Sequence, residues 1–260
     1  MTLEQALENI TVFTPPLARK EIRCIRENRA QAIPELLNIL ARSIAQAKGF
    51  SDEAYGLYAL YLLAEFKVPE ALELYIRILE LDEERCDFIL GDVLTEGMDA
   101  IVASVATQDD TPRLVQILEN KGLDVFQRLS VLRGLVIMYV TDTIARPELL
   151  QCIGSLLSRE DECEELLAFV ASTCLDIGAV EYFPRIRELF AMDKIERRIV
   201  GVDEFDEASL KMHKNGKLAR GERISEYTVI TDTIAALRGF ACFRSEKAEW
   251  APGSPMLPPS

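Results

Sequence analysis

The sequence predicts an all-α protein, a right-handed α-solenoid of five to six helical hairpins. Five prolines recur at spacings of 35, 43, 35 and 37 residues, and each opens a run whose apolar residues repeat with the period of a helix. Before each of these runs stands a second apolar stretch of helix length, so the repeating unit is a pair of helices. No extended stretch of alternating apolar and polar residues competes with this interpretation. The prolines are Pro34, Pro69, Pro112, Pro147 and Pro184.

The residues after each proline follow one pattern. The next residue is always charged and the fourth is always polar, whereas the second, fifth and sixth are always apolar, as Leu114, Ile117 and Leu118 are in the third run. Proline suits the first turn of a helix because it has no N–H to leave unbonded there and its φ is already helical. We therefore expect five helices that begin at the prolines and bury one common face.

The partner helix of each hairpin is expected in the apolar stretch before the proline. The fifth stretch ends in Asp176-Ile177-Gly178, where Gly178 is the expected left-handed residue that ends a helix. Short turns join the two helices of a hairpin and carry capping or helix-breaking residues, as in TQDDTPR at 107–113 and TDTIARPE at 141–148. The five stretches are residues 18–28, 51–66, 86–106, 124–140 and 160–178.

The repeat predicts one solenoid domain over residues 1–243, with a charged insertion or cap at about 201–224. Asn215-Gly216 is a strong hairpin-turn signal, but its flanks alternate poorly, so a small β-hairpin and a long loop both remain open for this segment. Residues 225–243 are expected to form a final helix, with Ser225 as a possible cap. The proline-rich tail, residues 244–260, is expected to be disordered.

The charge balance excludes several classes of function. The chain has 29 Lys plus Arg against 43 Asp plus Glu, which gives a formal charge of −14 and repels a phosphate backbone. The amino end has no basic start before an apolar run, and no stretch reaches the roughly 20 apolar residues of a membrane span. We therefore expect a cytoplasmic protein whose partner is another protein or a basic peptide, not a nucleic acid or a membrane.

Little in the sequence points to catalysis. His213 is the single histidine, the cysteines form no CxxC pair, and no glycine-rich phosphate loop follows a strand, so we expect no catalytic residue, no metal and no cofactor. The candidate ligand- or partner-binding residues are Asp92, Glu96 and Asp176. Asp92 and Glu96 lie four residues apart, on one face of the expected helix, where two like charges invite a cation or a basic partner. A solvated or capping role for these carboxylates remains open.

Three segments carry a resemblance to a known family. They are FILGDVLTEGMDAIVASVA at 88–106, LDIGAVEYFPRIRELF at 175–190 followed by IVGVDEF at 199–205, and TDTIAALRGFACF at 231–243. With them the chain resembles an uncharacterised bacterial family of HEAT-like helical-repeat proteins, a domain of unknown function. The resemblance covers nearly the whole chain, implies an α-solenoid and supplies no activity. Some relatives carry a cysteine-rich zinc-binding tail, but the tail of this chain has no cysteine, so that module is not carried over.

Two hypotheses about function follow. The first is a non-catalytic protein-binding scaffold or adaptor that uses the concave face of the solenoid, because such folds form large curved surfaces without catalytic residues. The alternative is a small-molecule- or cofactor-handling protein, or an enzyme, that uses carboxylates of the groove. Convergence of Asp92, Glu96 and Asp176 in one pocket would favour the alternative.

Overall fold

The computed structural model describes residues 1–12, 16–47, 56–159, 161–215, 222–240 and 243, with side chains for all of them except 212–215 and 222–223. These residues contain 15 α-helices and no strand, so the all-α class is confirmed. None of their helices has the length and apolar composition needed to cross a bilayer. The chain divides into two compact units, unit 1 with residues 1–65 and 231–260 and unit 2 with residues 66–230. The tail at 244–260 and the predicted turn at Gly216 lie outside the described residues.

Unit 1 combines the first four helices with the last one. Helix α15 packs against α2 and α4, and the rings of Tyr61 and Phe240 meet edge to face with centroids 6.2 Å apart. The C-terminal end of the chain therefore completes a core that is formed mainly by its N-terminal end. The helices are α1 (Leu3–Asn9), α2 (Arg19–Glu27), α3 (Arg29–Gln46), α4 (Leu57–Glu65) and α15 (Thr233–Leu237).

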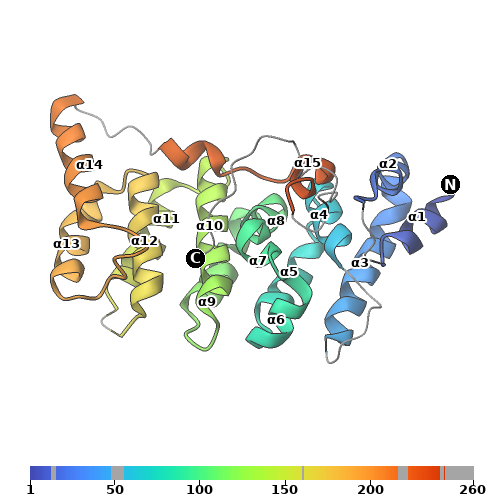
Figure 1. Ribbon diagram of the computed structural model, residues 1–260, viewed down its shortest axis with the longest axis horizontal. Helices are drawn as coiled ribbons and strands as arrows, with labels where there is room; N and C mark the ends of the chain where they lie inside the picture. The colour runs from blue at the N-terminus through green and yellow to red at the C-terminus, as the bar shows by residue number, and fades with distance from the viewer. Residues whose placement is uncertain (13–15, 48–55, 160, 216–221, 241–242, 244–260) are drawn as a thin grey trace, which may run out of the picture. The chain divides into compact units, whose positions relative to one another are not determined.

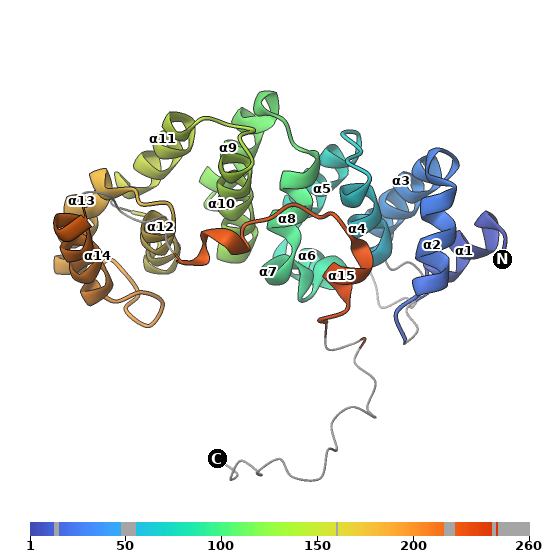
Figure 2. The ribbon, with the colours of Figure 1, turned by 90° about the horizontal axis from the view of Figure 1, so that it is seen from above.

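Unit 2 is organised around α10, most of whose residues are buried. Helices α8, α10 and α12 lie side by side, with α9 and α11 packed against α10 from another side (Figures 1 and 2). The α-helices are α5 (Ala71–Leu79), α6 (Glu83–Leu90), α7 (Val93–Glu96), α8 (Met98–Val105), α9 (Thr111–Glu119), α10 (Val125–Val140), α11 (Arg146–Leu157), α12 (Glu164–Asp176), α13 (Phe183–Ala191) and α14 (Val202–Asn215). Short 3₁₀ helices are η1 (Gln108–Asp110), η2 (Val180–Tyr182) and η3 (Glu222–Glu226).

Four of the five prolines mark a helix start, as the repeat predicts. Pro112, Pro147 and Pro184 stand in the first turn of α9, α11 and α13, and Pro69 lies two residues before α5. Leu114, Ile117 and Leu118 of α9 are at most 1% exposed, which confirms the face that the spacing assigned to the core. The proline register is therefore a sound guide to the helices of unit 2.

Pro34 is the exception, because it lies inside α3 instead of at its start. The N–H groups of Gln31 and Ala32 already donate to the carbonyl oxygen of Asn28, so the helix is established before the proline. Ala32 is fully buried and extends the apolar face upstream of Pro34. Pro34 sits early enough in α3 to remove only one backbone hydrogen bond.

Residues 86–106 form three helices, although the sequence suggested one helix-length stretch. Helix α6 ends at Gly91, whose φ of 47° lies in the left-handed region that favours glycine, and Gly97 separates α7 from α8. Asp92 and Glu96 therefore belong to a single short turn of helix, α7 and its preceding residue.

Residues 202–215 of the charged segment after α13 form the helix α14. The hairpin and the loop that the sequence left open are therefore both wrong for these residues. Phe205 explains this difference: it is fully buried, and its ring lies 5.0 Å from that of Phe183 and 5.8 Å from that of Phe190. One aromatic anchor thus fixes a helix whose other residues at 202–211 are mostly exposed.

Residues 225–243 do not form the single final helix expected from the sequence. Residues 227–230 have no regular secondary structure, and α15 begins only at Thr233, where the side chain of Asp232, not Ser225, caps it. The reason lies in residues 228–231, Thr-Val-Ile-Thr, because four β-branched residues in succession disfavour a helix and favour extended backbone.

Candidate functional site

Asp92 and Glu96 are solvent-facing residues at α7. Both are exposed, and the carbonyl oxygen of Asp92 accepts the N–H groups of Thr95 and Glu96. Among the described residues, no group of three or more His, Cys, Asp or Glu side chains has the arrangement of a metal site. The two carboxyl groups thus lie on an exposed turn.

Asp176 lies in a different environment, at the carboxyl end of α12. It is only 6% exposed, and its Oδ2 accepts a hydrogen bond of 2.9 Å from the hydroxyl of Tyr227. The helix ends there as predicted, because Gly178 has a φ of 63° and the N–H of Ala179 donates to the carbonyl oxygen of Cys174. Of the three predicted residues, Asp176 alone combines burial with a polar contact to a distant segment.

That distant segment, residues 224–230, is called the strap below. It passes across the side of α12, α10 and α8 that we call the strap face (Figure 2). The ring of Tyr227 has the guanidinium of Arg133 on α10 at 5.9 Å from its centroid, and the N–H of Ile230 donates to Ser104 Oγ on α8 at 2.8 Å. Three helices of unit 2 that lie side by side, α8, α10 and α12, thus each contact the strap.

Arg133 is held in place from the other side by Asp99 of α8. Arg133 Nε lies 3.1 Å from Asp99 Oδ2, and the same carboxylate accepts the N–H of Ala100 at 2.7 Å. Burial raises the pKa of Asp99, and the charge of Arg133 opposes that rise. The strap face therefore presents an arginine that is fixed between a buried carboxylate and an aromatic ring.

A small cavity of about 240 Å³ lies beside Tyr227, between α10 and α12. Its walls combine apolar side chains with three hydroxyl-bearing residues, two carboxyl-bearing residues and one arginine, and neither Asp92 nor Glu96 lines it. One water molecule needs roughly 10–15 Å³ of such space, and the cavity is many times larger, so it is large enough for a side chain. Besides Asp176, Arg133, Glu226 and Tyr227, the lining residues are Leu129, Phe169, Ser172, Thr173 and Ile199.

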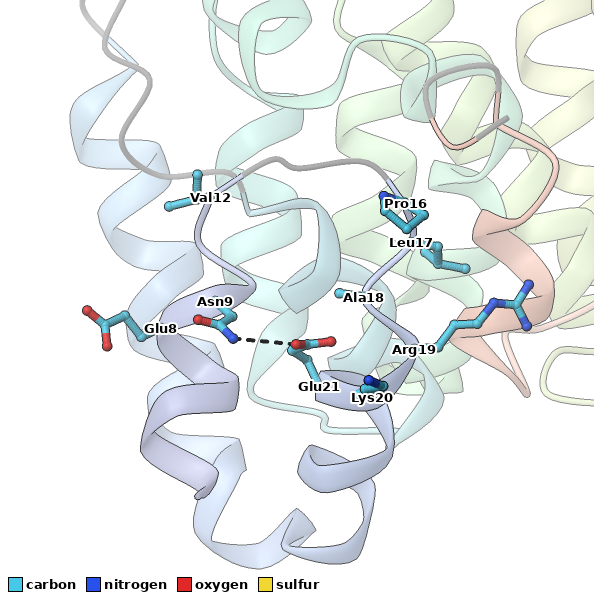
Figure 3. A pocket seen from close by; sticks show the side chains of 9 residues that line it. All are labelled: Glu8, Asn9, Val12, Pro16, Leu17, Ala18, Arg19, Lys20 and Glu21. Carbon is cyan, nitrogen blue, oxygen red and sulfur yellow. Dashed lines mark hydrogen bonds between the residues drawn. The ribbon is translucent and has the colours of Figure 1, made fainter. Parts of the chain in front are cut away.

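A larger hollow of about 780 Å³ in unit 1 is a weaker candidate (Figure 3). The side chains of Glu8 and Arg19 point away to opposite sides, and Asn9 donates a long hydrogen bond of 3.4 Å to Glu21 (Figure 3). The charged residues that line the hollow are exposed or half-buried. It offers no desolvated charge that would hold a ligand.

The structure thus separates the three predicted carboxylates, and it adds residues that sequence reasoning missed. Arg133, Tyr227 and Ser104 lie in apolar or mixed segments where no motif distinguishes them. The one usable signal was the β-branched run after Tyr227, which indicates an extended segment. Nothing in the sequence indicates which helices that segment crosses.

Comparison with known proteins supports a family assignment and supplies no activity. Two uncharacterised proteins, from Chlamydia muridarum and Chlamydia trachomatis, are each 27% identical to the chain over 212 residues. The match covers 79% of this chain and 84% and 83% of the two relatives. No solved structure matches the chain. The profile of the family described as "Protein of unknown function (DUF1186)" matches residues 1–244, and the chain therefore belongs to this uncharacterised family, which has bacterial relatives.

Proposed function

We propose that the chain is a non-catalytic protein-binding scaffold or adaptor, and that it is built as a right-handed solenoid of HEAT-like hairpins. The observation that carries the proposal is the strap itself. Helices α8, α10 and α12 hold residues 227–230, which belong to no helix or strand, through the hydroxyl and ring of Tyr227 and the backbone N–H of Ile230. A face with these contacts has the features needed to bind an extended segment of another protein.

Contacts at one repeat length support the solenoid arrangement within unit 2. Hydrogen bonds join Arg113 to Glu80, 33 residues away, Arg146 to Glu181, 35 residues away, and Ser155 to Glu119, 36 residues away. Polar contacts that recur at the period of the proline register are what stacked hairpins produce, because each hairpin packs on its neighbours.

The described geometry offers no specific support for the alternative, a carboxylate-based ligand-handling protein or enzyme. Convergence of Asp92, Glu96 and Asp176 would favour that hypothesis, but Asp92 and Glu96 are exposed at α7, whereas Asp176 is buried and accepts a hydrogen bond from Tyr227. A formal charge of −14 favours another protein or a basic peptide as the partner over a nucleic acid. We place the protein in the cytoplasm, because the described cysteines are free thiols and reducing compartments keep thiols in that state.

A site-specific photo-crosslinker tests the proposal. It is placed at Ser172, which lines the cavity on α12, and in a matched variant at Gln151, which is exposed on α11. After crosslinking in the native host, we expect one stoichiometric protein to be captured from position 172 and not from position 151. Capture from neither position, or equal capture from both, would refute binding at the strap face. Circular dichroism of both variants confirms beforehand that each is folded.

A further inference from the structure

We infer that the strap, a segment of the same chain, occupies the site at which a segment of the partner binds. The strap face accepts an extended segment in which a tyrosine is followed three residues later by a β-branched aliphatic residue, and such a segment from another protein displaces the strap. The inference rests on the proposed function, and it adds the chemistry of the partner segment and the need for displacement.

The spacing of the two anchors follows from geometry. Tyr227 contacts α12 and α10, and Ile230 contacts α8. Three residues of extended chain span about 10 Å, and the axes of packed helices lie about 8–10 Å apart. Three residues are therefore enough for a segment in extended conformation to reach from one helix to the next, so a tyrosine and an aliphatic residue at i and i+3 reach neighbouring positions.

Each anchor position selects a particular side chain. The tyrosine position offers the carboxylate of Asp176 to a hydroxyl and the guanidinium of Arg133 to a ring face. Phenylalanine would leave the buried Asp176 without this donor, which is costly for a buried carboxylate. At the second position the side chain of Ile230 is only 8% exposed, and Ser104 Oγ takes the backbone N–H. A large polar residue is excluded there.

The strap is placed so that it can leave. Ser225, Glu226 and Thr228 are exposed, Tyr227 and Val229 are half-buried, and residues 227–230 belong to no helix or strand. Segments with few buried apolar contacts open at a lower free energy than the core does.

Tethering determines the size of the expected effect. A segment on the same chain acts at an effective concentration in the millimolar range, so it competes strongly with a free peptide of the same sequence. Weakening the strap contacts must therefore expose the face to that peptide. We expect at least a tenfold gain in peptide affinity when the two anchors are removed from the chain.

The test uses the full chain and a fluorescent peptide with the sequence of residues 224–233, ISEYTVITDT. Fluorescence anisotropy measures its dissociation constant for the wild type and for a Tyr227→Ala, Ile230→Ala double variant. We expect binding at least tenfold tighter to the double variant. A peptide with phenylalanine at the tyrosine position should bind more weakly, and so should the original peptide once Asp176→Asn is added to the double variant.

Two outcomes would overturn the inference: equal peptide affinity for wild type and double variant, or no binding to a double variant that circular dichroism shows to be folded. Amide exchange of the wild type gives an independent measurement that needs no substitution. In that experiment the N–H of Ile230 should exchange faster than the N–H groups of α10. Equal protection would show that the strap opens only together with the core, which would contradict the inference. Neither measurement uses a partner. A protein captured through position 172 therefore leaves the proposed function standing even if the strap never opens.

Discussion

The buried ion pair between Arg128 and Glu162 offers the sharpest test of how unit 2 is held together. Both side chains are at most 3% exposed, and two parallel hydrogen bonds of 2.9 and 2.7 Å join the guanidinium to the carboxylate. Arg128 Nε also donates to the carbonyl oxygen of Leu118, and Glu162 accepts the N–H of Cys163. The pair thus ties the end of α9 to the start of α12.

Glu162→Gln removes the negative charge and leaves the buried guanidinium without its counter-ion. Breaking a buried pair from one side costs about 3–5 kcal/mol, because the remaining charge stays desolvated. For a chain of this size that loss corresponds to a fall in melting temperature of roughly 6–20 °C. The matched control is Glu80→Gln: its partner Arg113 and Glu80 itself are 44% and 36% exposed, and such pairs contribute about 0–1 kcal/mol.

Urea unfolding followed by far-UV circular dichroism measures both variants at pH 7 and at lower pH. Burial, the largest single influence, would by itself raise the pKa of Glu162. The hydrogen bonds from Arg128 and from the N–H of Cys163, together with the positive charges of Arg128 and Lys121, outweigh burial and hold that pKa below its ordinary value. A carboxyl whose pKa is lower in the folded state stabilises the protein above its unfolded pKa, about 4.3, and this stabilisation is lost as the pH falls through the folded value. The difference in the free energy of unfolding between wild type and Glu162→Gln should therefore become smaller below about pH 4. If Glu162→Gln and Glu80→Gln lowered the free energy of unfolding equally at pH 7, the buried pair would not stabilise unit 2 more than an exposed one.

Three further predictions concern other parts of the molecule. Leu118→Asp places a charge at a fully buried position of α9 and should abolish cooperative melting, whereas Leu210→Asp, at a position 63% exposed on α14, should melt like wild type. Arg26→Met removes the ion pairs that link α2 to Glu65 and Asp232, so the amides of α15 should exchange faster while those of α10 do not change; unchanged protection of α15 would contradict this role. Cys163 is exposed, whereas burial raises the pKa of Cys86 to about 12. Mass spectrometry after brief alkylation at pH 8 should therefore find Cys163 modified and Cys86 intact. Modification of Cys86 before Cys163 would contradict the exposure of Cys163 and the burial of Cys86.

The helices of unit 2 were predictable because their signals are local. Proline in a first turn and an apolar face at helical spacing both act within about ten residues, and Pro112, Pro147 and Pro184 confirm them. The charged segment after α13 differed from expectation because contacts outside that segment decide its structure. The sequence left a hairpin and a loop open for residues 202–215, and the helix there is anchored by Phe205, which packs against Phe183 and Phe190 of α13. Charge dominates the local pattern, whereas one buried ring decides the outcome.

The candidate site was less predictable, for a related reason. Asp176 was chosen for its place near a helix end, but its partner Tyr227 is 51 residues away in sequence. Asp92 and Glu96 were chosen for their spacing on one face, but Gly91 and Gly97 confine them to a single exposed turn. Spacing in sequence predicts which residues share a helix face. It does not predict which segment crosses that face.

The polar groups of the strap face have a consequence for selectivity that an apolar groove would lack. A purely apolar segment could fill the cavity between α10 and α12, but it would cover the carboxylate of Asp176 and the guanidinium of Arg133 without replacing the contacts of Tyr227. The free-energy penalty for burying polar groups without new partners is larger than the stabilisation from a small apolar contact. Discrimination between partners therefore depends on the penalty for a wrong segment as much as on the attraction of a correct one. On this argument the face should distinguish tyrosine from phenylalanine more strongly than it distinguishes isoleucine from valine three residues later, because the first change leaves a buried carboxylate short of a donor and the second removes only one methylene group.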